Sequence, residues 1–89
     1  MIQTQITIIN KLGLHARAAA KFVPCASSFS SRIQAGKDGA LVDAKSIMSV
    51  MMLAAGKGTV LDLEIEGKDE DAALEALTQL IQNRFDEAE

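Results

Sequence analysis

The chain has 89 residues, of which 48% are hydrophobic and 24% are charged, and this composition argues against a disordered segment. Its length predicts a single domain, residues 1–89, with one hydrophobic core. The formal net charge of −3 and the three aromatic residues argue against nucleic acid as a partner, because stacking nucleic-acid binders need a basic face and exposed rings.

The first part of the chain predicts a strand followed by a helix. Residues 2–9 are rich in β-branched side chains that partly alternate with polar ones, which is typical of a strand with one buried face. Residues 16–28 carry apolar side chains at helical spacing. The predicted buried stripe of this helix consists of Ala16, Ala19, Ala20, Val23 and Ala26. Pro24 lies beyond the first turn, so we expect it to kink or loosen the helix near Ala20.

A hairpin and a short helix are expected next. Residues 32–35 and 40–43 predict two strands. Between them, Lys37-Asp38-Gly39 is a hairpin signal, because an Asp-Gly pair suits a tight turn between antiparallel strands. Ser46 is a good helix N-cap, and the largely apolar residues 47–54 predict a short helix behind it.

The last part of the chain predicts a strand and an amphipathic helix. Residues 59–66 alternate between apolar and acidic side chains, so one face of this strand is buried. Asp69 is expected to cap the final helix. The buried stripe predicted for this helix is Ala73, Leu74, Leu77, Leu80 and Ile81. The element order βαββαβα predicts an α+β open-faced sandwich, in which three helices cover one face of a four-stranded antiparallel sheet.

Cysteine use and the N-terminal residues bear on the compartment. Cys25 is the only cysteine, so no intramolecular disulfide forms, and its apolar neighbours predict a small buried side chain. Residues 1–5 lack the pattern of a signal peptide, and no apolar run is long enough to cross a bilayer. We therefore expect a cytoplasmic protein that does not insert into membranes.

The candidate chemistry centres on His15, the only histidine, in the motif Gly13-Leu14-His15-Ala16-Arg17. The motif lies where the strand pattern gives way to the helix, and a helix start attracts anions through its free N–H groups and its dipole. Arg17 supplies a cation that binds phosphate or carboxylate oxygens. This pattern predicts a phosphate site; the alternative is a purely structural histidine that caps the helix.

Two other kinds of chemistry are disfavoured at His15. A zinc site needs three or four ligands, and the chain has no second histidine and no cysteine pair. A serine hydrolase needs an oriented acid and an oxyanion hole, neither of which the spacing identifies. We expect no metal and no cofactor.

A family resemblance rests on three segments: Gly13 to Arg17, Lys45-Ser46-Ile47-Met48-Ser49-Val50-Met51-Met52-Leu53, and Lys57-Gly58. Over essentially its whole length the chain resembles the HPr family, the histidine phosphocarriers of the bacterial phosphoenolpyruvate-dependent phosphotransferase system. The resemblance implies the HPr-like sandwich fold. One departure is visible, since the family motif commonly continues with proline where this chain has Ala18.

The resemblance also implies a function for His15 and Arg17. His15 would accept a phosphoryl group from phosphorylated enzyme I and pass it to the A domains of sugar permeases, while Arg17 would steady the phosphate. Such a protein is a phosphoryl carrier and not an enzyme in the usual sense, and we expect it to be a monomer. Ser46 would be a regulatory site for an HPr kinase/phosphorylase.

The helix that follows Ser46 is apolar nearly all round, so some of its side chains must be exposed. Ile47, Met48 and Met51 are candidates for a partner-docking patch, the alternative being that they pack in the core. Two other functions stay open. The first is a paralogue on a nitrogen-related phosphotransfer chain, and the second is a regulatory adaptor that docks through this helix and leaves His15 idle.

Overall fold

Strands and helices follow one another in the predicted order βαββαβα in a computed structural model that describes all residues 1–89. The elements are β1 (Ile2–Thr7), α1 (Ala16–Ser27), β2 (Arg32–Lys37), β3 (Ala40–Asp43), α2 (Ile47–Met52), β4 (Val60–Glu66), α3 (Glu70–Gln82) and a short helical turn, η1 (Arg84–Asp86). None of the helices is long and apolar enough to span a membrane.

The four strands form one antiparallel sheet in the order β1-β4-β2-β3. The C-terminal strand β4 therefore lies inside the sheet, between β1 and β2. Its inward residue Leu63 stands opposite Thr4 of β1 and Ala35 of β2. Because side chains alternate between the faces of a strand, this register puts one apolar row on one side of the sheet and one polar row on the other.

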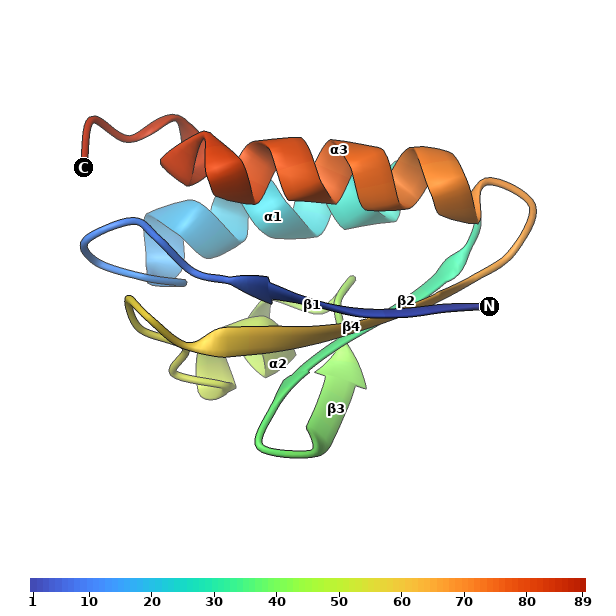
Figure 1. Ribbon diagram of the computed structural model, residues 1–89, viewed down its shortest axis with the longest axis horizontal. Coiled ribbons are helices and arrows are strands. Elements are labelled where there is room, and N and C mark those ends of the chain that lie inside the picture. The colour runs from blue at the N-terminus through green and yellow to red at the C-terminus, as the bar shows by residue number, and fades with distance from the viewer.

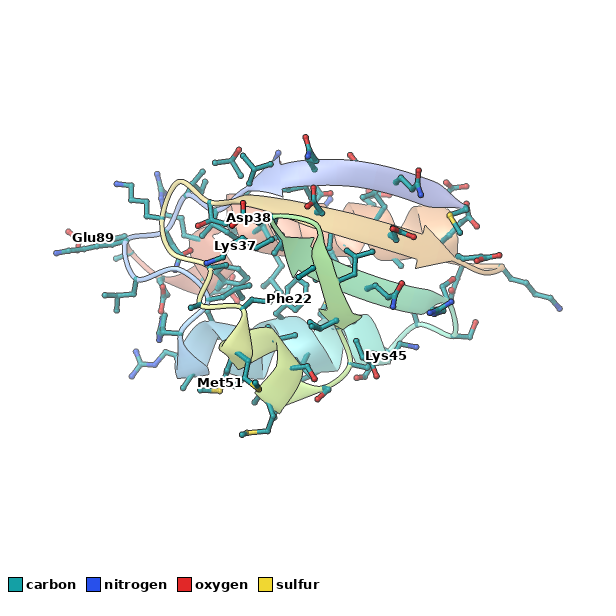
Figure 2. The ribbon with its side chains drawn as sticks, turned by 90° about the horizontal axis from the view of Figure 1, so that it is seen from below. Phe22, Lys37, Asp38, Lys45, Met51 and Glu89 are labelled. Atoms are coloured by element: carbon teal, nitrogen blue, oxygen red, sulfur yellow. The ribbon has the colours of Figure 1, made fainter.

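The helices cover the apolar face of the sheet. Figure 1 shows α1 and α3 side by side above the sheet, whereas α2 lies at the β3 end and contacts α1 and β3. Side chains from all three helices and the inner strands form one cluster of 19 buried hydrophobic residues. Phe22, labelled in Figure 2, is with Phe85 one of the two largest fully buried side chains and reaches from α1 into this core. The predicted open-faced sandwich is thus confirmed.

The buried face of α1 differs from the predicted stripe. Ala16 and Ala20 are exposed, and the buried residues are Ala18, Ala19, Phe22 and Ala26. Phe22 explains the difference, because its ring has far more apolar area to bury than an alanine methyl group and therefore decides which face turns inward. The helix continues through Pro24 as far as Ser27. Cys25, expected to be buried, is half-buried, and this burial raises the pKa of its thiol.

Asp69 occupies the N-cap position of α3, but its side chain makes no capping hydrogen bond, contrary to the prediction. Its carboxylate instead accepts hydrogen bonds from the backbone N–H groups of Ser30 and Ser31, both at 2.9 Å, and from the hydroxyl groups of the same two serines. These bonds, led by that of the Ser31 hydroxyl, lower the pKa of Asp69 from 3.8 to about 2. Asp69 therefore fastens the turn before β2 to the start of α3.

We predict that Asp69→Asn destabilises the fold in a pH-dependent way. The amide has one acceptor oxygen where the carboxylate has two, so part of the Ser30 and Ser31 network is lost. Because the folded pKa of about 2 lies below the ordinary 3.8, the Asp69 contribution is present above pH 3.8 and is lost as the pH falls towards 2. Urea unfolding at several pH values measures this difference.

The matched control is Asp71→Asn, which removes an exposed carboxylate from the same helical turn. It should change stability less than Asp69→Asn at neutral pH. Equal effects of the two variants, or an Asp69→Asn deficit that persists unchanged down to pH 2, would contradict the prediction.

Candidate functional site

The loop before α1 is held by a close backbone contact at Gly13. Gly13 has a φ of +67°, and a Cβ atom added there would lie 2.6 Å from the Cα atom of Gly56. The next residue, Leu14, donates its backbone N–H to the Ala55 carbonyl at 2.8 Å. Only glycine accommodates both the positive φ and this approach, so Gly13 allows the loop to dock on the segment that leaves α2.

His15 is the N-cap residue of α1, as the sequence predicted, and its backbone is extended. Its carbonyl accepts the first hydrogen bond of the helix, from the Ala19 N–H at 2.8 Å. Its side chain makes no capping bond, so the helix does not use the imidazole. The side chain is 28% exposed. His15 is therefore held by its backbone at the positive end of α1, with part of its ring open to solvent.

One nitrogen of the His15 ring contacts a carboxylate from the far end of the chain. His15 Nε2 lies 2.6 Å from Glu87 Oε2, and the Glu87 side chain is 15% exposed. The other carboxylate oxygen, Oε1, accepts a hydrogen bond from Asn10 Nδ2 at 2.9 Å. The Asn10 and His15 contacts, in that order, lower the pKa of Glu87 below its ordinary value. No hydrogen bond within the chain engages Nδ1, the second ring nitrogen of His15.

The sequence did not predict Glu87 as a site residue. Glu87 reaches His15 because the chain makes an unusual turn after α3. Arg84, Phe85 and Asp86 have φ values of +55°, +53° and +63°, so the backbone is left-handed at three successive residues. Phe85 is fully buried, and its ring fastens this turn to the core. The sequence feature that could have indicated this contact is a large aromatic residue soon after the amphipathic helix, followed by acidic residues at 86, 87 and 89.

An open pocket of about 570 Å³ with charges of both signs lies between the start of α1 and the C-terminal segment; it is lined by Arg17 and Glu87, although not by His15 itself. Lys11, Arg17 and Lys21 contribute cations, and the segment 86–89 contributes the acidic side chains. Lys11 pairs with Glu89 at 3.5 Å and Lys21 pairs with Asp86 at 3.4 Å. Arg17 is exposed and forms no ion pair or hydrogen bond through its side chain, so its guanidinium is free for an external anion. No group of three or more His, Cys, Asp or Glu side chains is placed to hold a metal ion.

Ser46 lies far from His15 along the same layer of helices. Its hydroxyl caps α2, as predicted, by accepting the Ser49 N–H at 3.3 Å. The preceding side chain, Lys45, donates to the Phe29 carbonyl beyond the C-terminal end of α1, whereas His15 lies at the N-terminal end. The twelve residues of α1 span about 18 Å. Figure 2 likewise shows Lys45 at the lower edge of the molecule, well separated from Glu89 at the left end.

The outer face of α2 is apolar and exposed. The three side chains predicted for a docking patch are exposed by 42% (Ile47), 67% (Met48) and 39% (Met51). Met52, which the prediction omitted, is 80% exposed, whereas Val50 is fully buried. Met51 is visible on this face in Figure 2. We call Ile47, Met48, Met51 and Met52 the α2 patch. It continues towards the His15 loop, because Ala55, just beyond α2, holds Leu14.

Comparison with known proteins identifies relatives over the whole chain. Residues 2–83 match a family described as the PTS HPr component phosphorylation site. The chain is 63% identical over 86 residues to a phosphocarrier protein HPr from Pseudomonas aeruginosa, covering 96% of each chain. It is 56% identical over 89 residues to that of Cupriavidus necator, covering 100% of each. A crystal structure of HPr from Thermoanaerobacter tengcongensis superposes with a TM-score of 0.95 at 49% identity, covering 100% of each chain.

Proposed function

Because this chain belongs to the HPr family, the phosphocarriers of the phosphotransferase system, we propose that His15 is its phosphoryl acceptor. The observation that carries the proposal is the state of the ring. The imidazole sits at the start of α1 without capping it, its Nδ1 atom has no partner within the chain, and Arg17 is unpaired beside it. A nucleophile and two sources of positive charge thus meet at one exposed point.

The transfer step follows from this arrangement. The lone pair of His15 Nδ1 attacks the phosphorus atom of the donor, a new N–P bond forms, and the bond from phosphorus to the donor atom breaks with its electron pair staying on the donor. The equatorial oxygens carry the negative charge, which the free N–H groups of the α1 start and the Arg17 guanidinium stabilise. Passing the group on reverses the step at the acceptor, and the N–P electron pair returns to Nδ1.

We also propose the protein partners, on the basis of the family. Phosphorylated enzyme I is the donor and the A domains of sugar permeases are the acceptors, as the family resemblance implies. The protein is then a carrier in the cytoplasm, consumed and regenerated as a substrate, and not itself an enzyme. We also propose that it acts as a monomer.

The α2 patch is proposed as the surface on which these partners dock. Exposed methionine side chains are flexible and polarizable, so one patch adapts to several partners in turn. Its continuity with the His15 loop through the Leu14–Ala55 hydrogen bond supports this assignment, since a partner bound there would lie near the imidazole. Core packing accounts for Val50 and Leu53 of the same segment.

Ser46 is proposed as a regulatory phosphorylation site for an HPr kinase/phosphorylase. A phosphate on this hydroxyl lies at the N-terminal end of α2, where the helix tolerates negative charge, so the fold survives. Ile47 of the α2 patch follows directly, so the added charge acts on docking. The separation of Ser46 from His15 along α1 means that the phosphate does not touch the transfer site.

We predict that phosphoenolpyruvate and enzyme I phosphorylate this protein on His15. The parent should gain one acid-labile phosphate, seen by mass spectrometry, and His15→Ala should gain none. His15→Ala should fold, because the side chain makes no capping bond.

Arg17→Gln should still be phosphorylated, but about 100-fold more slowly, since a charge that stabilises the transition state is lost.

The control is an authentic HPr phosphorylated in parallel by the same enzyme I. If that control is labelled and the folded parent is not, the carrier function with this donor is wrong, and the paralogue or the adaptor takes its place. Acid-labile phosphate on His15→Ala equal to that on the parent would also overturn the assignment.

We predict that Met48→Ser weakens docking of enzyme I without changing the fold. The side chain is 67% exposed, so its loss leaves no cavity, whereas loss of an apolar interface contact costs about 1–2 kcal/mol, roughly a 5- to 30-fold rise in KM. Steady-state transfer kinetics measure this change. Val60→Ser is the matched control, because Val60 is 46% exposed on the open face of the sheet. Equal KM values for the two variants would contradict the docking surface.

We predict that Ser46→Asp raises the KM for an acidic partner, whereas Ser46→Asn leaves it near the parent value. Aspartate and asparagine are both good N-caps of similar size, so the comparison isolates the negative charge. Circular dichroism and urea unfolding should show both variants folded. A KM that rises equally in both variants would assign the effect to the cap, and unchanged values in both would remove Ser46 from docking.

A further inference from the structure

We propose that Glu87 is a positioning residue for phosphoryl transfer: its carboxylate holds the proton of His15 on Nε2 and so keeps Nδ1 as the nucleophilic nitrogen. The proposal rests on the function assigned to His15 above and adds to it a residue outside the motif. It is built on the 2.6 Å contact between Glu87 Oε2 and His15 Nε2. An ionised carboxylate has no proton to donate, so Nε2 must be the donor in this hydrogen bond.

Asn10 explains why a carboxylate is required at this place. Its side chain is fully buried, and its Nδ2 donates both to the Gly13 carbonyl and to Glu87 Oε1, each at 2.9 Å. Glu87 therefore stands between two donors, Asn10 and His15. A carboxylate accepts from both, whereas an amide has only one acceptor oxygen and must turn its NH₂ group towards one of them. An amide facing His15 would favour the other tautomer, with the proton on Nδ1.

The C-terminal turn is what holds Glu87 in this position. The buried Phe85 and the left-handed residues 84–86 bring the chain back from α3 over the start of α1. The pairs Lys21–Asp86 and Lys11–Glu89 flank Glu87 on either side in the sequence. The backbone N–H of Lys11 also donates to the backbone oxygen of Glu89 at 2.5 Å. The Glu87 carboxylate is thus held by contacts on both sides of it in the sequence, and it is oriented before any partner binds.

The carboxylate also matters while the phosphoryl group is attached. When the Nδ1 lone pair forms the N–P bond and the proton stays on Nε2, the ring becomes cationic. Glu87 faces this cation across the Nε2–H hydrogen bond and stabilises it, as a carboxylate does for a histidine in a catalytic triad. On transfer to the acceptor the N–P electron pair returns to Nδ1, and the neutral ring with its proton on Nε2 is restored.

The test uses nitrogen NMR of the intact, unphosphorylated protein, labelled with ¹⁵N in the His15 ring and measured where the ring is neutral. In the parent the two ring nitrogens should give well-separated shifts, with the protonated type at Nε2. In Glu87→Gln and Glu87→Ala the shifts should move towards each other or exchange, because the Nδ1–H tautomer is populated. Asp71→Asn, which removes an exposed carboxylate from the first turn of α3, away from the C-terminal turn, should keep the parent pattern.

Phosphoryl transfer is measured on the same proteins. Glu87→Gln should lower kcat about 10- to 100-fold with little change in KM, a loss of the size seen when the hydrogen-bond partner that orients a metal-bound histidine is removed. Unchanged nitrogen shifts in both Glu87 variants, or a fall in kcat that Asp71→Asn reproduces, would overturn the proposal. If the parent shows the Nε2–H tautomer but is never phosphorylated, Glu87 still positions the ring and the function assigned to His15 fails.

Discussion

The molecule depends on the burial of one face of β4. This strand pairs with β1 on one side and with β2 on the other, so it alone joins β1 to the β2–β3 hairpin within the sheet. Leu61, Leu63 and Ile65 are at most 1% exposed, and burying such a side chain stabilises the fold by about 1.5–3 kcal/mol. Because α1 follows β1 and packs over this face, the position of His15 depends on β4 although β4 contributes nothing to the site.

The candidate site is assembled from the two ends of the chain. The loop after β1 supplies His15 with its backbone fixed at the helix start, and the turn after α3 supplies Glu87. The two segments come together because α1 and α3 lie side by side on the sheet. The backbone of His15 begins the helix, while its ring contacts Glu87 and is available for the proposed phosphoryl transfer. This separation frees the side chain for chemistry without weakening α1.

The charges around His15 suit a group that must be accepted and then released. The chain is acidic overall, with a net charge of −3, yet Lys11, Arg17 and Lys21 gather at this one pocket. The acidic segment 86–89 neutralises two of these cations through ion pairs and leaves Arg17 free. A phosphoryl group would therefore meet one unpaired cation and a helix start. If His15 is phosphorylated as proposed, this arrangement would limit how tightly the phosphohistidine is held and keep it a good donor.

Short-range patterns in the sequence determined the order of the elements, the cap at Ser46 and the place of His15 at a helix start, because periodicity and capping act over a few residues. The inward face of α1 was mispredicted, since counting alanines ignored the larger area of Phe22. Only the tertiary structure decided the partners of Asp69 and Glu87, which lie 38 and 72 positions away at Ser31 and His15. Contacts of that kind depend on how the chain folds back on itself, and no local pattern encodes the reversal.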